Sequence, residues 1–152
     1  MKQSRFFLLL LSVIICLSSC NSKIKYPSGK DTVMSFGDGT YQIGKVGTAR
    51  PMSYAPIGFC IIDHVTEVYE TETKVYIIGE HRAQKQEVFA VIDLEKNTLV
   101  LYEKLKTNNA KTFWTGSDLI DEGIITSLTS FYDFPQEDQA VFRDKGRFTA
   151  VR

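Results

Sequence analysis

The side chains best suited to proton transfer or metal binding are few in this chain, which contains two histidines. His64 directly follows Asp63, and a carboxylate can orient an imidazole for acid–base chemistry. Adjacent residues of a strand point to opposite faces, so we expect this pair to serve a turn and not a reaction. His81 stands between charged neighbours and is expected to face solvent in a loop. No His-Glu-x-x-His run, paired cysteine or glycine-rich phosphate loop is present, so the sequence predicts no catalytic residue, no cofactor and no metal site.

Two other groups of polar residues could be interpreted as functional sites, but a structural role explains each of them more simply. Ser117 lacks the glycine two positions later that a hydrolase nucleophile elbow requires, so we expect it to cap a helix. Glu67, Glu70 and Glu72 are spaced along a strand pattern, whereas calcium needs a loop with carboxylates at set intervals. We therefore expect these glutamates to form a solvated edge strand, protected by charge against pairing with other chains.

Cys60 and the C-terminal aromatic residues are the remaining candidates. Cys60 lies in an apolar run, which predicts a buried and inert thiol. Phe113, Trp114 and Tyr132 are the candidate ligand-binding residues, because tryptophan and tyrosine are common on binding surfaces. The alternative is that the aromatic residues here pack the C-terminal helices on a sheet, and we favour that reading.

The N-terminal residues carry a targeting signal. Lys2 and Arg5 precede an apolar run over residues 6–17, which is shorter than the roughly 20 residues that a helix needs to span a bilayer. A basic start, an apolar middle and small residues before a cleavage point are typical of a secretory signal peptide. The ending Leu17-Ser18-Ser19-Cys20 resembles the lipobox of bacterial lipoprotein precursors.

This resemblance implies that the chain is cleaved before Cys20 and that Cys20 carries a diacylglycerol and often an amide-linked fatty acid such as palmitate. Two or three acyl chains hold a protein firmly on a membrane, whereas one is marginal. Asn21 is not the aspartate that commonly retains such proteins at the inner membrane, so an outer-membrane location is expected if the source is Gram-negative. The predicted segments are a signal peptide (1–19), a lipidated tether (20–30) and one globular domain (31–152).

Composition limits the partners of the mature chain. The full sequence has 18 basic and 18 acidic side chains, and removal of the signal peptide takes away two basic ones. A slightly acidic chain lacks the basic patch that nucleic-acid binding requires. Cys60 would be the one cysteine left unmodified, so no disulfide within the domain is expected. The domain must then be held together by its apolar core.

The pattern of the domain is β-rich first and helical later. Strands are expected at residues 32–36, 40–46, 57–62, 65–71, 74–80, 87–93 and 98–103. Two prolines mark residues 49–56 as a loop. The strands at 74–80, 87–93 and 98–103 are apolar on both faces, so we expect each face to be covered.

Helix signals begin at Ser117 and again at Pro135, with Gly123 and Gly146 as possible ends. Apolar residues at helical spacing also allow the first helix to continue past Gly123, and residues 147–152 form either a last strand or a tail. The expected fold is α+β, an antiparallel meander of about seven strands with a C-terminal helical segment. The alternative is a small all-β sandwich or barrel.

These observations predict a membrane-anchored protein of the bacterial cell envelope that is not an enzyme and acts as a binding or interaction module. The expected partners are the membrane, through Cys20, and another envelope protein. The alternative is an inhibitor or immunity lipoprotein that neutralises a lytic enzyme or a toxin, an analogy with small lipid-anchored β domains.

Overall fold

The computed structural model describes residues 26–104 and 117–152, and over these residues the fold is mainly β. The described residues form ten strands in two sheets, more than the seven or so expected from the sequence. The small sheet is an antiparallel meander in the order β1-β2-β3-β4. Its strands are β1 (Thr32–Phe36), β2 (Tyr41–Gly44), β3 (Met52–Tyr54) and β4 (Phe59–Ile62).

β3 corrects the expectation of a loop over residues 49–56. The strand lies between Pro51 and Pro56, so neither proline ring occupies a ladder position inside it. Pro51 even contributes its carbonyl, which accepts a hydrogen bond of 2.8 Å from the backbone N–H of Gly44. Met52 at the start of β3 is fully buried.

The large sheet has the order β10-β5-β6-β7-β8-β9 and is antiparallel except for the β8–β9 pair. Thr149 and Ala150 of β10 pair with β5, so the segment expected to be an edge strand has a neighbour on both sides. The strands are β5 (His64–Glu70), β6 (Lys74–His81), β7 (Gln86–Asp93), β8 (Thr98–Lys104), β9 (Ile125–Leu128) and β10 (Thr149–Ala150).

The first helical segment is shorter than the helical spacing allowed. α2 (Ser117–Asp121) ends two residues before Gly123, which adopts a φ of +70° that glycine tolerates without strain. The chain then enters β9 next to β8 instead of continuing the helix, and Ile125 is buried. Tertiary pairing therefore overrides the helical spacing of the apolar residues here.

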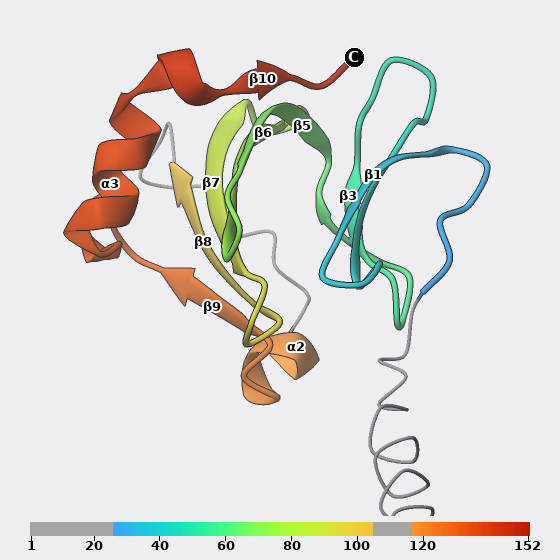
Figure 1. Ribbon diagram of the computed structural model, residues 1–152, viewed down its shortest axis with the longest axis horizontal. Coiled ribbons are helices and arrows are strands. Elements are labelled where there is room, and N and C mark those ends of the chain that lie inside the picture. The colour runs from blue at the N-terminus through green and yellow to red at the C-terminus, as the bar shows by residue number, and fades with distance from the viewer. Residues whose placement is uncertain (1–25, 105–116) are drawn as a thin grey trace, which may run out of the picture.

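The large sheet is covered on both faces, as its doubly apolar strands predicted. Figure 1 shows three layers, with the small sheet on the right, the large sheet in the middle and α3 (Gln136–Arg143) on the left. Alternate residues of the large sheet pack against the small sheet, among them Val75, Ile77, Ala90, Ile92, Leu99 and Leu101. The intervening residues, Tyr76, Ile78 and Val91, pack with Phe134 and Phe142 under α3.

A buried polar contact fixes α3 on this outer face. The Asp138 carboxylate accepts hydrogen bonds of 2.8 Å from the Tyr76 hydroxyl and from the Lys74 ammonium. Ring contacts complete the layer: the Phe142 ring meets the Tyr76 ring edge-on at 5.6 Å. The helix begins after Pro135, as predicted, and ends at Asp144 before Gly146.

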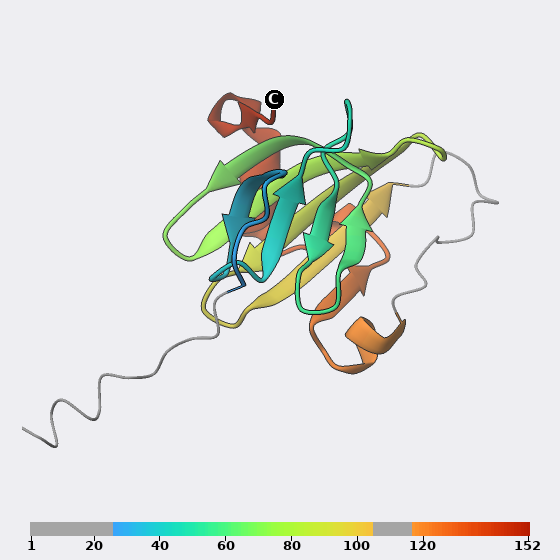
Figure 2. The same ribbon diagram turned by 90° about the vertical axis from the view of Figure 1, so that its right-hand side faces the viewer.

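The turns that connect the antiparallel strands of the small sheet lie at two opposite ends, as Figure 2 shows. The described chain begins at Tyr26 beside the β1–β2 turn, where the Tyr26 N–H donates to the Asp38 carbonyl at 3.1 Å. The β3–β4 turn lies at this same end, which we call the proximal end. The β2–β3 loop lies at the opposite, distal end, together with the β6–β7 turn, because Arg82 of that turn donates hydrogen bonds to Thr48.

Candidate functional site

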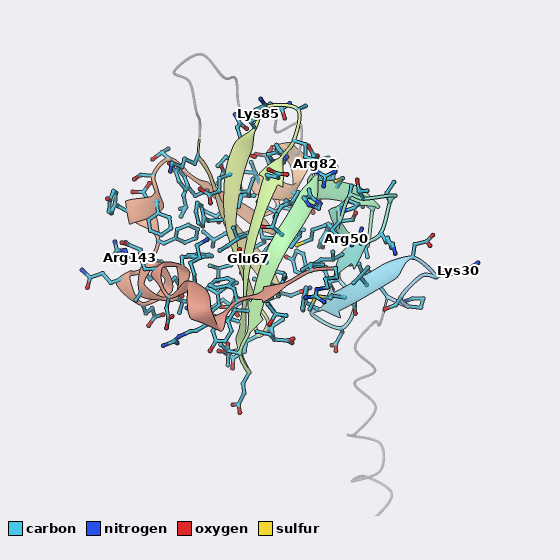
Figure 3. All side chains as sticks on the ribbon, turned by 90° about the horizontal axis from the view of Figure 1, so that it is seen from above. Lys30, Arg50, Glu67, Arg82, Lys85 and Arg143 are labelled. Atoms are coloured by element: carbon cyan, nitrogen blue, oxygen red, sulfur yellow. The ribbon has the colours of Figure 1, made fainter. Side chains whose placement is uncertain are left out.

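The distal end carries a group of polar side chains that the core partly encloses. We call Arg50, Asp63, His81, Gln84, Gln86 and Glu103 the distal polar cluster. Figure 3 shows Arg82 and Lys85 at the tip of the β6–β7 hairpin and Arg50 on the neighbouring small sheet. The cluster lies where these elements converge.

Strand register places the central members on one face. His81 of β6 is directly opposite Gln86 of β7, and Glu103 of β8 is opposite Val88 of β7. Opposed residues in an antiparallel ladder share a face, and Val88 belongs to the core between the sheets. The three polar side chains therefore extend the inner face of the large sheet beyond its apolar part. His81 and Glu103 are each 7% exposed and Gln86 is 1% exposed.

His81 lies between two carboxylates. Its Nε2 is 3.1 Å from the Glu103 Oε1, and its Nδ1 is 3.3 Å from the Asp63 Oδ2. The hydrogen bond to Glu103 raises the pKa of His81, with a further contribution from Asp63, and these effects outweigh the opposing effect of burial. An imidazolium donates from both nitrogens, so the contacts on both sides favour the protonated ring.

This geometry corrects the sequence-based prediction for His81 and shows a partner for Asp63 that the sequence did not indicate. His81 was expected in a solvent-facing loop and is instead a buried residue at the end of β6. Asp63 pairs with His81 and not with its neighbour His64. The Nδ1 of His64 accepts a hydrogen bond of 2.9 Å from the backbone N–H of Arg50, and burial together with Arg82 lowers the pKa of His64.

The cluster also holds unsatisfied polar atoms. Within residues 26–104 and 117–152, every buried side-chain nitrogen or oxygen without a hydrogen-bond partner lies at the distal end. Leaving such an atom unpaired costs about 1–3 kcal/mol, so each one calls for a partner such as water or a ligand group. The atoms are Arg50 Nε, Gln84 Oε1, both amide atoms of Gln86, and Glu103 Oε2.

Cys60 departs from its prediction as well. Its thiol is exposed, because β4 turns this side chain away from the core between the sheets. Burial of part of the thiol and the nearby Asp63 raise its pKa, which disfavours the reactive thiolate. The expectation of an inert thiol thus has a different physical basis from the one that the apolar run indicated.

The aromatic candidates separate into three cases. Phe113 and Trp114 lie outside the described residues, so their role as ligand-binding residues stays a prediction. Tyr132 is exposed in η1 (Phe131–Asp133), at the edge of α3. Phe131 and Phe134 pack under α3 against the large sheet, which is the packing role that we favoured for this region.

The acidic residues of β5 do not gather at one point. Glu67 lies 4.0 Å from Lys145, a long and partly exposed ion pair of small energetic weight. Among the described residues, no group of three histidine, cysteine, aspartate or glutamate side chains is arranged to hold a metal ion. What the structure brings together at His81 is a pair of carboxylates, Asp63 and Glu103, with Gln86 opposite it on the neighbouring strand.

Comparison with protein-family models, with curated proteins and with solved structures finds no match. In the described part of the chain, no helix has the length and apolar character that crossing a membrane requires.

Proposed function

We propose that the protein is a lipid-anchored lipoprotein of the bacterial cell envelope whose domain acts as a non-enzymatic binding module. The anchor follows from the lipobox-like run that ends at Cys20. An outer-membrane location is favoured for a Gram-negative source because Asn21 follows that cysteine. We keep α+β as the proposed fold class because α3 forms a layer of its own on the large sheet.

The observation that carries the binding role is the concentration of unsatisfied buried polar atoms at the distal end. Such atoms are costly in a domain that has nothing to bind, and here they lie at the end opposite Tyr26, the first described residue. An anchor near Tyr26 would therefore present the distal polar cluster away from the membrane. The partly exposed side chain of Arg82 borders the distal polar cluster.

The anchor is tested by replacing the modified residue. Cys20→Ala is expected to leave an unprocessed precursor or a released domain after an alkaline membrane wash. Cys16→Ala is the matched control, because Cys16 lies within the segment that cleavage removes and should leave fractionation unchanged. A Cys20→Ala protein that still remains with washed membranes would refute the lipid anchor.

The binding role is tested by crosslinking and mass spectrometry from native envelopes, with the tagged, lipidated protein as bait. Arg82→Ala alters the rim of the distal polar cluster, whereas Lys96→Ala alters an exposed lysine on the β7–β8 turn. Capture of one partner that Arg82→Ala reduces and Lys96→Ala does not would support the distal site. Equal capture by all three baits would contradict it. A lytic enzyme or toxin as that partner would favour the inhibitor or immunity alternative.

A further inference from the structure

The proximal end of the domain carries an exposed apolar turn beside the start of the described chain. Residues 55–58 connect β3 to β4, and the Gly58 N–H donates to the Ala55 carbonyl at 3.3 Å, which closes a β-turn. Proline is favoured at the second position of such a turn because its φ is already set. Pro56 occupies that position, so Ile57 is held at the tip of a preformed turn. Its side chain is 64% exposed.

The tip is close to the point from which the tether leaves. The Tyr26 N–H bonds the Asp38 carbonyl, and the Ala55 N–H bonds the Thr40 carbonyl at 2.8 Å, so both segments attach to the same β1–β2 turn. Tyr26, Ala55 and Gly58 also line one shallow groove on the small sheet. Figures 1 and 2 show the β3–β4 turn and the start of the coloured chain at the same end of the small sheet.

The surroundings of the tip resemble a membrane-interface contact in composition. Tyr54 lies next to the turn, partly buried against the Tyr41 ring, and Tyr26 lies nearby. Burial raises the pKa of Tyr54, and Tyr26 and Glu122 raise it further. Tyrosine rings are enriched at the level of lipid headgroups, and an apolar residue beside them can enter the acyl boundary. A Cβ built on Gly58 meets nothing within 4 Å, so none of the residues that the structure describes covers this side of the turn.

Chain length brings this end to the membrane. Cys20 precedes Tyr26 closely, and an extended chain of that length spans at most about 20 Å. We propose that the turn at residues 55–58 is a second membrane contact, in which Ile57 enters the headgroup region of the bilayer that holds the lipid anchor. The proposal rests on the proposed function, because the anchor supplies the proximity. The contact would orient the domain with its distal polar cluster away from the bilayer.

Acidic residues near the turn indicate which lipid headgroups it would contact. Glu72 and Glu95 line a second hollow at the proximal end, and anionic headgroups would repel them. The contact is therefore expected on zwitterionic lipid, where the apolar tip enters without that repulsion. Vesicles of phosphatidylcholine are the appropriate test surface.

The test is fluorescence quenching by brominated phosphatidylcholine. Trp114 is the one tryptophan of the chain, so Trp114→Phe provides a silent background. Ile57→Trp in that background reports on the tip. The matched control is Val46→Trp, because Val46 is 67% exposed on the β2–β3 loop at the distal end. With bromines placed near the headgroups, Ile57→Trp should lose roughly half of its emission and shift to the blue, whereas Val46→Trp should change in neither respect.

Two forms of the protein separate this proposal from the lipid anchor. One is the acylated chain in vesicles, with acylation of Cys20 read by mass spectrometry. The other is a Cys20→Ser chain from which the signal peptide is absent, held on the vesicles by an N-terminal histidine tag and a few nickel-chelating lipids. If the tagged form shows quenching of Ile57→Trp and not of Val46→Trp, the result supports the membrane contact. This holds even where mass spectrometry of the other form shows that Cys20 is not acylated. Equal quenching of the two reporters, or quenching of neither, would overturn it.

Discussion

Glu103→Gln tests the distal polar cluster most directly, because the two side chains share a shape and differ in charge. In the folded protein His81 Nε2 lies 3.1 Å from Glu103 Oε1, to which it donates a hydrogen bond when the ring is protonated, and both side chains are almost fully buried. A hydrogen bond to a charged partner contributes about 1.5–3 kcal/mol. We expect the substitution to lower the free energy of unfolding by this amount while His81 is protonated.

The effect must depend on pH in a defined direction. The pKa of His81 is raised in the folded protein, chiefly by its hydrogen bond to Glu103. A raised folded pKa stabilises the protein fully below the unfolded pKa of about 6.5, and that stability is lost as the pH rises through the folded pKa. At high pH the His81 ring is neutral, so the buried Glu103 side chain has no cation beside it and its Oε2 has no hydrogen-bond partner. Glu103→Gln should then leave the free energy of unfolding unchanged or raise it.

The assay is urea denaturation of the wild type and the variant near pH 5.5 and near pH 9, with an NMR titration of the His81 ring. The titration should show a lower pKa for His81 in Glu103→Gln than in the wild type. Glu70→Gln is the control, since Glu70 is exposed on β5 and should change the free energy of unfolding by less than about 0.5 kcal/mol at either pH. A loss of stability in Glu103→Gln that is the same at both pH values would refute the imidazolium–carboxylate pair.

Two further substitutions and one reactivity measurement test other parts of the structure. Asp138→Ala removes the acceptor of a buried hydrogen bond from Tyr76 and of a partly buried one from Lys74. It is expected to lower the free energy of unfolding by about 3 kcal/mol, measured by urea denaturation, and a loss below about 1 kcal/mol would contradict the buried contact. Gly79→Ala places a Cβ 2.7 Å from the His64 carbonyl oxygen and 2.8 Å from the Ile62 side chain. The free energy of unfolding should therefore fall by about 1–3 kcal/mol, seen as a lower melting temperature. An unchanged melting temperature would count against this packing. Cys60 should react with a thiol reagent near pH 7.5 more slowly than a free cysteine despite its exposure, whereas a faster rate would show an activated thiolate.

Short-range signals predicted much of the strand pattern. Gly37, Asp38 and Gly39 all adopt positive φ in the β1–β2 turn, which is the conformation that such a run indicates. β1 has the predicted bounds, and β6 and β7 differ from theirs by one residue at one end. These features depend on turn chemistry and on β-branched and aromatic content within a few residues, so the sequence was sufficient.

Elements that depend on distant partners were missed. β3 is a strand because β2 and β4 supply its ladder, and the prolines beside it masked that possibility. β9 exists because β8 offers a free edge, although its residues carry helical spacing. β10 likewise forms by pairing with β5, a strand far earlier in the chain. No local pattern of three or four residues encodes such a partner.

The candidate site shows the same division. The sequence determined the alternation that gives the large sheet two apolar faces and the turn chemistry that joins its strands, whereas the anchor at Cys20 stays a prediction. Only the tertiary structure decided that His81 is buried. Its exposure depends on how far the small sheet covers this part of the large sheet, and on its contact with Glu103, which lies on β8, two strands from β6. Burial and pKa are set by the packing of distant segments, and the types of the neighbouring residues, Glu80 and Arg82, carry no information about that packing.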